Sequence, residues 1–299
     1  MFGIPDGWGE IDDEESKKAI HKALELGVTF FDTADAYGTG HSEEVLGEAL
    51  KGRRNEAVIA TKFGYTYDEA ARALIGEDSS PEYVRKACEA SLRRLKTDYI
   101  DLYQLHRWSI PDEEIDQVID MLEKFVSEGL IRAYGWSTDK ADSAKVFVEN
   151  SNCSALQQCM NIFWHEPKVL ELCEKYNLAS INRSPLAMGL LSGKFNAGST
   201  LSGNDVRGQT LDWSSYFKNG KPVKEYLDKI ESVKEILQSN GRTLAQGSLA
   251  WIWAKSPKTI PIPGFKNVRQ VEENAMAMEF GPLNQQQMQE IERILTVQQ

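Results

Sequence analysis

Phe30-Phe31-Asp32-Thr33-Ala34-Asp35-Ala36-Tyr37-Gly38 is the stretch of sequence that decides the fold of this chain. Residues 28–31 are apolar and partly β-branched, which suits a strand that is buried on both faces. Asp32 stands where that strand should end, and Tyr37 follows in a polar loop. Because α/β barrel enzymes present their chemistry at the carboxyl ends of strands, this order of elements indicates an α/β enzyme.

Helix starts flank this stretch on both sides. Asp12 is predicted to cap a helix, with Glu15 three residues later as its capping-box partner. Ser42 can cap the helix that follows the loop, and Glu43 and Glu44 would lie near the positive end of its dipole.

The same alternation of strand and helix continues along the whole chain. We expect seven strands, over residues 28–31, 57–61, 99–105, 131–136, 156–159, 179–182 and 259–262. We expect helices over residues 12–26, 42–51, 112–128, 140–149, 167–176, 223–239, 243–254, 268–278 and 285–296, and another that starts at Pro81. This alternation predicts a parallel sheet. No G-x-G-x-x-G follows any strand, which favours a closed barrel over an open dinucleotide-binding sheet.

Composition limits the class of protein. The 299 residues suit one α/β barrel domain over 1–299, since such barrels run to about 250 residues. A net charge of −11 argues against binding to nucleic acid or to an anionic membrane. The four cysteines form no CxxC pair, and no apolar run reaches the length of a membrane span. We therefore expect a cytoplasmic protein with reduced thiols.

Polar residues stand at the ends of four predicted strands, namely Asp32, Lys62, His106 and Ser137. Each alone has an ordinary structural explanation, as a turn, a surface charge or a hydrogen-bonded side chain. In a barrel, however, these ends converge on one mouth, where Tyr37 would join them.

The chemistry of this group is that of carbonyl reduction. A tyrosine phenol has a pKa near 10, and a buried Lys62 ammonium beside Tyr37 would favour the phenolate. Asp32 would keep Lys62 charged, and His106 could hydrogen-bond a carbonyl oxygen. Such a site donates a proton, so the hydride must come from a cofactor.

At this point the sequence resembles the aldo-keto reductase family. The resemblance rests on motifs that occur in the family's order and cover about residues 10–297: residues 32–38, 42–47, 60–62, 98–103 with His106, 184–186, 193–194, 263–264 and 272–274. It implies a (β/α)8 TIM barrel and reduction of aldehydes or ketones to alcohols with a nicotinamide cofactor, usually NADPH.

The resemblance also implies residue roles. Tyr37 would be the general acid, Asp32 and Lys62 would tune it, and His106 would orient the substrate. Ser137 and Gln157 would hold the nicotinamide carboxamide, with Asn161 beside them. The remaining cofactor contacts would be Arg183, Ser184, Leu186, Gly264, Lys266 at the 2′-phosphate, and Gln270 and Asn274 at the adenosine end; Trp108 would contact the substrate. Arg183 replaces a stacking aromatic residue, and the Asn-Arg-Ser-Pro-Leu run over 182–186 resembles a bacterial and archaeal-type subgroup.

Two features depart from the family's pattern. The usual Ser-Asn pair is Ser137-Thr138 here, which removes one expected carboxamide contact. Only eleven residues precede the first helix, too few for the usual hairpin and first barrel strand. We therefore expect the barrel to lack its first strand, to expose two strand edges, and to be prone to self-association and weaker cofactor binding.

Other interpretations remain open at this stage. A barrel of this kind could be a non-catalytic, NADP-binding regulatory subunit, and the four site residues do not separate the two. A metal-dependent hydrolase is disfavoured, because His21, His41, His106 and His165 form no H-x-H pair. The carbonyl substrate and the oligomeric state are not determined, although aromatic residues and the loop over 198–222 could wall a pocket. These aromatic residues are Trp136, Phe163, Trp164 and those within 213–217.

Overall fold

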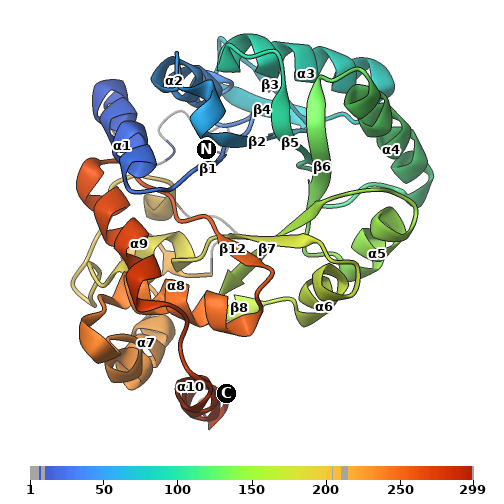
Figure 1. Ribbon diagram of the computed structural model, residues 1–299. Helices are drawn as coiled ribbons and strands as arrows, with labels where there is room; N and C mark the ends of the chain where they lie inside the picture. Colours follow the sequence, from blue (N-terminus) through green and yellow to red (C-terminus); the bar gives the residue numbers. More distant parts are fainter. Residues whose placement is uncertain (1–6, 8–10, 204, 210–214, 298–299) are drawn as a thin grey trace.

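Seven parallel strands curl into one sheet that helices surround (Figure 1). The structure is a computed structural model, and it describes residue 7 and residues 11–203, 205–209 and 215–297. Along the sheet the strands are β1 (Phe30–Asp32), β2 (Val58–Phe63), β5 (Ile100–Leu105), β6 (Ile131–Ser137), β7 (Ala155–Asn161), β9 (Ala179–Arg183) and β12 (Thr259–Pro261). These are the seven strands predicted from the sequence.

The two ends of this sheet, β1 and β12, do not pair with each other. Within the described residues, no further parallel strand joins them, so the prediction of a barrel open at one position is confirmed. Pro261 ends β12, and an edge strand tolerates a proline because one side of its backbone needs no partner.

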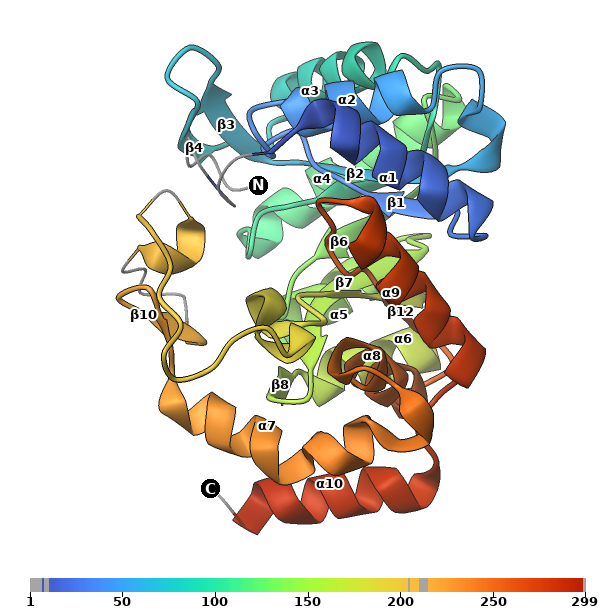
Figure 2. The same cartoon turned by 90° about the vertical axis from the view of Figure 1, so that its left-hand side faces the viewer.

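Ten α-helices lie outside the sheet in the described part of the chain. They are α1 (Asp13–Glu25), α2 (His41–Ala49), α3 (Pro81–Leu95), α4 (Asp112–Ser127), α5 (Ala141–Glu149), α6 (Pro167–Lys175), α7 (Lys224–Leu237), α8 (Leu244–Lys255), α9 (Val268–Phe280) and α10 (Gln285–Val297). The helices α1 and α9 lie side by side across the open position (Figures 1 and 2). The Val268 N–H donates to Glu15 Oε1 at 3.4 Å, and Lys22 pairs with Glu272.

Two helix starts differ from the sequence prediction. Asp12 caps α1 as expected, but Glu15 closes no capping box, because its carboxylate accepts from α9 instead. Ser42 lies inside α2, which begins after Gly40, and its hydroxyl pairs with Thr33 Oγ1 at 2.8 Å. Both side chains bond to residues outside their own helices.

Short strands occupy regions for which the sequence predicted no strand. The chain after β2 forms an antiparallel hairpin of β3 (Tyr65–Asp68) and β4 (Ala73–Glu77). The segment between β9 and α7 contains the hairpin of β10 (Phe217–Lys218) and β11 (Lys221–Pro222). The short strand β8 (Trp164–His165) pairs with β7. Both hairpins lie on the same side of the molecule (Figure 2).

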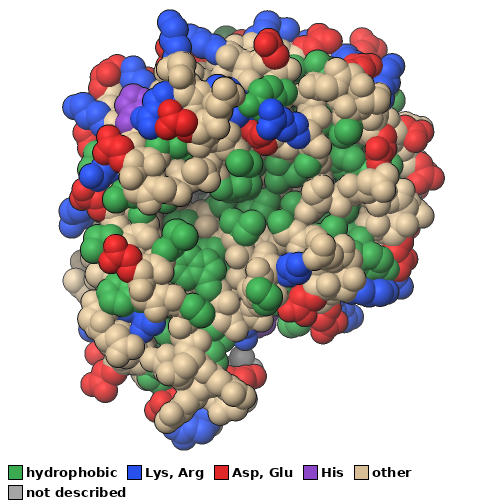
Figure 3. Space-filling view, in the orientation of Figure 1, with side chains coloured by type: hydrophobic (Ala, Val, Ile, Leu, Met, Phe, Trp, Pro, Cys, Tyr) green, Lys and Arg blue, Asp and Glu red, His purple; other side chains and the backbone are tan. Residues whose placement is uncertain are grey.

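The core is layered around and inside the sheet. One apolar cluster packs α1 to α5 against the strands, and another joins α7, α8 and α10. Inside the sheet lies a small third cluster of Ala60, Leu102, Ala155 and Ile181. Charged side chains cover the outer rim of the molecule, and hydrophobic side chains gather around a hollow at the centre of the face in Figure 3.

Candidate active site

A polar layer lies directly above the small apolar layer inside the sheet. Alternate residues of a strand point to the same side, so the residues two positions after the apolar four also face the interior. These are Lys62, Gln104, Gln157 and Arg183, from β2, β5, β7 and β9. Strand periodicity therefore places three predicted site residues, and Gln104 besides, in one ring.

Asp32 and Lys62 form a buried ion pair at the centre of this ring. The Lys62 side chain is fully buried, and its ammonium also donates to the Thr33 carbonyl at 2.7 Å. The second Asp32 oxygen accepts from Gln157 Nε2 at 2.8 Å and from Gln104 Nε2 at 3.3 Å. Burial lowers the pKa of Lys62, but Asp32 and Tyr37 outweigh it, and the net pKa is raised. Lys62 therefore stays charged.

Tyr37 lies beside this pair, with Lys62 Nζ 5.0 Å from its ring centroid. We expected Lys62 to shift Tyr37 toward the phenolate. Burial raises the pKa of Tyr37 more than the Lys62 charge lowers it, so the net pKa is above its ordinary value. The effect expected of Lys62 is therefore present, but burial outweighs it.

His106 completes the group as a neutral imidazole. Its ring meets the Tyr37 ring edge-on at 5.6 Å between centroids and the Tyr65 ring at 5.1 Å. Burial, followed by the charges of Lys62 and Arg183, places the His106 pKa well below its usual range. Its Nδ1 is buried without a hydrogen-bond partner among the described groups. One ring nitrogen thus has capacity to bond a ligand.

The residues expected at the nicotinamide carboxamide are buried beside Asp32. Ser137 Oγ lies 3.5 Å from Gln157 Oε1, and the Gln157 amide binds Asp32. Asn161 donates to the Ser184 carbonyl at 3.1 Å and to Tyr216 Oη at 3.0 Å. Thr138, which departs from the family's Asn, donates instead to the Trp108 carbonyl at 2.7 Å.

Arg183 leaves the polar ring toward a second ion pair. Its guanidinium binds Asp139 and lies 5.5 Å from the centroid of the Trp108 ring. Lys140 Nζ lies 6.0 Å from the same ring, which is 44% exposed. Two cations thus flank an open aromatic face at the site.

Basic side chains from three segments gather near the start of α9. Lys194, Arg207, Lys266 and Arg269 are close enough to affect one another, and burial and this repulsion together lower the pKa of Lys194. Burial also lowers the pKa of Lys266. Within a chain of net charge −11, such a cluster at a helix N-terminus suits a phosphate group.

The other predicted cofactor residues lie around this cluster and the neighbouring turn. Ser184 has φ 55°, and Leu186 precedes the 3-10 turn Ala187–Ser192. Gly264 is exposed between β12 and α9. Gln270 Oε1 accepts from the Lys266 N–H at 2.7 Å, and Asn274 lies one turn further along α9. Their contacts with a cofactor stay predictions.

Sequence reasoning missed five residues of the site. Gln104 could have been found from strand alternation, and Tyr65 from its position three residues after Lys62. Asp139 and Arg207 gave no local signal, because their roles depend on tertiary neighbours. Lys194 stands in a motif that supported the family resemblance, yet it received no role. Conversely, Trp136 was a candidate pocket residue but is fully buried in the core, and Trp213 lies outside the described residues.

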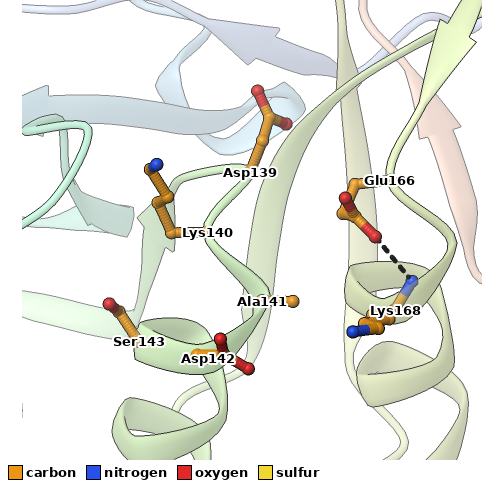
Figure 4. A pocket seen from close by; sticks show the side chains of 7 residues that line it. All are labelled: Asp139, Lys140, Ala141, Asp142, Ser143, Glu166 and Lys168. Carbon is orange, nitrogen blue, oxygen red and sulfur yellow. Dashed lines mark hydrogen bonds between the residues drawn. The ribbon is translucent and has the colours of Figure 1, made fainter.

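A shallow pocket of about 460 Å³ lies beside the site (Figure 4). It is lined by Asp139, Lys140, Ala141, Asp142, Ser143, Glu166 and Lys168, at the starts of α5 and α6. None of the four proposed catalytic residues lines it, and its walls are mostly charged, unlike the apolar walls of most small-molecule sites. We therefore place the chemistry at the polar ring.

Within the residues that the structure describes, no group of three His, Cys, Asp or Glu side chains could hold a metal ion. No helix there combines the length and apolar composition that a membrane crossing requires.

Comparison with known proteins shows the family of this chain. A family model described as the aldo/keto reductase family matches residues 1–296. The chain belongs to the aldo/keto reductase family.

Relatives and solved structures of this family match nearly the whole of this chain. The aldo-keto reductase yakc of Schizosaccharomyces pombe, whose name specifies NADP(+), is 32% identical over 93% of this chain and 82% of its own. The glycerol dehydrogenase AKR11B4 of Gluconobacter oxydans superposes with a TM-score of 0.84 at 31% identity, covering 99% of this chain and 90% of that one. An aldo-keto reductase from Klebsiella pneumoniae, solved in complex with NADPH, has a TM-score of 0.67 at 26% identity, covering 94% and 84%.

Membership in the family supports the barrel type predicted from the motifs. The curled parallel sheet with its outer helices has the architecture of the (β/α)8 neighbours. The assignment to a bacterial and archaeal-type subgroup stays a prediction.

Proposed function

We propose that this aldo/keto reductase is an NADPH-dependent enzyme that reduces the carbonyl group of an aldehyde or ketone to an alcohol. The observation that carries the proposal is the buried group of Asp32, Lys62, Tyr37 and His106 at the carboxyl ends of β1, β2 and β5. It joins a proton donor, a fixed cation beside it and a neutral hydrogen-bonding ring.

Each residue has a role that follows from its surroundings. The Tyr37 hydroxyl keeps its proton because burial raises its pKa, so it can donate to a carbonyl oxygen. The phenolate that remains would be stabilised by the Lys62 ammonium, whose charge Asp32 maintains. Neutral His106 would bond the carbonyl oxygen and direct it toward Tyr37. Without such orientation the donor and acceptor would meet in few productive arrangements.

The residues present fit a dinucleotide phosphate cofactor. Lys266, Arg269, Lys194 and Arg207 would hold its phosphates, while Ser137 and Gln157 are placed for a carboxamide. Relatives that bind NADP or NADPH support this choice. When bound, the nicotinamide supplies the hydride to the carbonyl carbon.

The decisive experiment compares wild type with Tyr37→Phe in NADPH oxidation over an aldehyde panel that includes 4-nitrobenzaldehyde. We expect turnover by wild type and a loss of about 100-fold or more in kcat for the variant, since a positioned general acid contributes that much. NADPH binding, followed by cofactor fluorescence, should change little in the variant.

A matched control is Tyr99→Phe. Tyr99 is half-buried like Tyr37, but it lies just before the first residue of β5, at the end of the strand away from His106. This variant should keep full activity. Full activity of Tyr37→Phe would overturn the role of Tyr37. Tight NADPH binding by wild type without turnover would favour the non-catalytic regulatory subunit instead.

A further inference from the structure

A second group of charged residues is buried behind the loop that carries Tyr37. Asp35, Glu43 and Arg94 come from this loop, α2 and α3, and the mechanism above uses none of them. The Asp35 and Glu43 side chains are fully buried, and the Arg94 side chain is 14% exposed. Burying three ionisable side chains is costly, so their arrangement needs a reason.

Glu43 and Arg94 form an ion pair that ties α2 and α3 to the strand beneath. Arg94 Nε donates to Glu43 Oε2 at 2.7 Å, and Thr61 Oγ1 donates to Glu43 Oε1 at 2.6 Å. Thr61 immediately precedes Lys62 on β2. Glu43 also lies in the first turn of α2, where the helix dipole favours a negative charge. Glu43 is therefore the carboxylate of this group that has both a cation and a hydrogen-bond donor as partners.

Two glycines make room for Arg94. A Cβ atom at Gly40 would lie 2.7 Å from Arg94 Cδ, and Gly40 has φ +98°. A Cβ atom at Gly47 would lie 2.6 Å from the Arg94 carbonyl oxygen. Gly40, just before α2, and Gly47, in its C-terminal half, thus let this helix lie close to Arg94.

Asp35 is left over when these charges are paired. Lys62 pairs with Asp32, and Arg94 Nε pairs with Glu43, while Arg94 Nη2 is buried without a hydrogen-bond partner among the described groups and so does not bond to Asp35. Neither carboxyl oxygen of Asp35 meets a donor at hydrogen-bond geometry among the described groups. An ionised carboxylate without such partners would carry a far larger desolvation cost than a neutral carboxyl.

The charged and titratable groups around Asp35 also favour a neutral Asp35 carboxyl. Burial raises the pKa of Asp35 well above its usual range and the Glu43 charge raises it further, while Arg94, the Ala36 N–H and Lys62 lower it by smaller amounts. Three phenols from β3, α3 and β5 are also within electrostatic range: Tyr67, Tyr83 and Tyr103. None of them carries a positive charge that could stabilise a carboxylate.

The backbone around Asp35 connects this buried group to the catalytic residues. The Asp35 N–H donates to the Lys62 carbonyl at 3.3 Å, and the Lys62 ammonium donates to the Thr33 carbonyl at 2.7 Å. The Tyr37 N–H closes the turn by donating to the Ala34 carbonyl at 3.1 Å. The buried Asp35 side chain therefore anchors this turn. Thr33, whose carbonyl accepts from Lys62, lies just before Asp35 in the chain, and Tyr37 lies just after it.

We propose that Asp35, Glu43 and Arg94 form a buried unit that positions Tyr37 relative to Lys62, and that Asp35 acts in it as a neutral carboxylic acid. Asp35 is thus a positioning residue rather than a catalytic one. The inference rests on the proposed function, but its protonation part can be tested without any enzyme assay.

The first experiment compares urea unfolding of wild type and Asp35→Asn between pH 4.5 and pH 8. A raised carboxyl pKa in the folded state gives stability that is complete below the unfolded pKa and is lost as pH rises through the folded pKa. Asparagine does not ionise, so Asp35→Asn does not lose this stability as pH rises. We expect the unfolding midpoint of the variant to rise relative to wild type as pH increases, while the exposed control Asp120→Ala shows no such trend. A constant or falling difference would overturn the neutral Asp35.

The second experiment measures kcat and KM for NADPH and an aldehyde in Asp35→Asn and Asp35→Ala. Asparagine keeps the size and neutrality of the side chain, so kcat should stay within about twofold. In Asp35→Ala the side chain that holds the turn is lost, so Tyr37 should be misplaced. We expect kcat to fall by about tenfold and the KM values to stay within about twofold, because a misplaced reacting group mainly lowers the rate of the chemical step. An unchanged kcat in Asp35→Ala, or an equal loss in both variants, would overturn the positioning role.

The two experiments separate this inference from the proposed function. If wild type shows no turnover, the proposed function fails, while the urea series still decides whether Asp35 is neutral. Crystal structures of wild type and Asp35→Ala would then show whether Tyr37 moves from Lys62, and an unmoved Tyr37 would overturn the positioning role. If Asp35→Ala shows no cooperative unfolding, Arg94→Met replaces it, with the same expected loss of kcat.

Discussion

At the scale of single residues, burial decides the chemistry of the site. Lys62 stays charged because Asp32 and Tyr37 outweigh the cost of its burial. Lys62 lowers the pKa of Tyr37, as their proximity suggested, but burial raises that pKa by more. His106 is neutral because burial lowers its pKa. A resting site with a charged Lys62 and a protonated Tyr37 is ready to donate a proton.

The Asp32–Lys62 pair gives a stability prediction at this scale. Lys62→Met leaves the Asp32 carboxylate buried without its cation, and we expect a loss of about 3 kcal/mol in the free energy of unfolding. The double variant Asp32→Asn with Lys62→Met removes both charges and should recover at least about 1 kcal/mol. Neither variant should retain activity. The measurement is urea unfolding combined with NADPH oxidation.

The control for this pair is Arg53→Met, which breaks the exposed Arg53–Glu56 pair. Surface pairs contribute little, so its free energy of unfolding should change by less than about 1 kcal/mol. A double variant no more stable than Lys62→Met alone would show that the unpaired charge is not the source of the loss.

At the scale of elements, side-chain hydrogen bonds fix the backbone at the start of α9. Asn267 Oδ1 caps the helix by accepting from the Gln270 N–H at 3.0 Å, and Gln270 Oε1 accepts from the Lys266 N–H at 2.7 Å. These reciprocal bonds hold the backbone that carries Lys266. Gln270, expected at the adenosine end, therefore also has a structural role that its position in the sequence did not reveal.

This element predicts a cofactor preference. Lys266→Met removes a cation from the proposed 2′-phosphate site. The Kd for NADPH should therefore rise by about tenfold, which corresponds to the free energy of one hydrogen bond to a charged group. NADH lacks that phosphate, and its Kd should change by less than about twofold. Lys168→Met, which removes an exposed lysine at the pocket of Figure 4, is the matched control. Equal effects on both cofactors would contradict the assignment of Lys266.

At the scale of the whole molecule, the sheet is held together at its open position by helices. The helices α1 and α9 bridge the gap through packing, the Glu15–Val268 bond and the Lys22–Glu272 pair, while β1 and β12 keep unpaired edges in the described part of the chain. Unpaired edges favour pairing with other chains. The self-association expected from the sequence stays a prediction.

We expect this open position to be the least protected part of the sheet. In hydrogen exchange followed by mass spectrometry, peptides from β1 and β12 should exchange faster than those from the central strands β5 and β6. Glu15→Ala should increase exchange in α9 and in both edge strands, because it removes a bond between α1 and α9. Equal protection across all seven strands would mean that the position is closed.

The sequence by itself determined the fold class, the seven parallel strands and the group of Asp32, Tyr37, Lys62 and His106. These depend on strand alternation and on which residues follow each strand, and both are local in the chain. Only the tertiary structure decided the net pKa of Tyr37, the Asp139–Arg183 pair, the loss of the Glu15 and Ser42 caps, and the buried unit behind Asp35. Burial and pairing depend on residues distant in the chain, and the balance between desolvation and charge exists only once the fold brings them together.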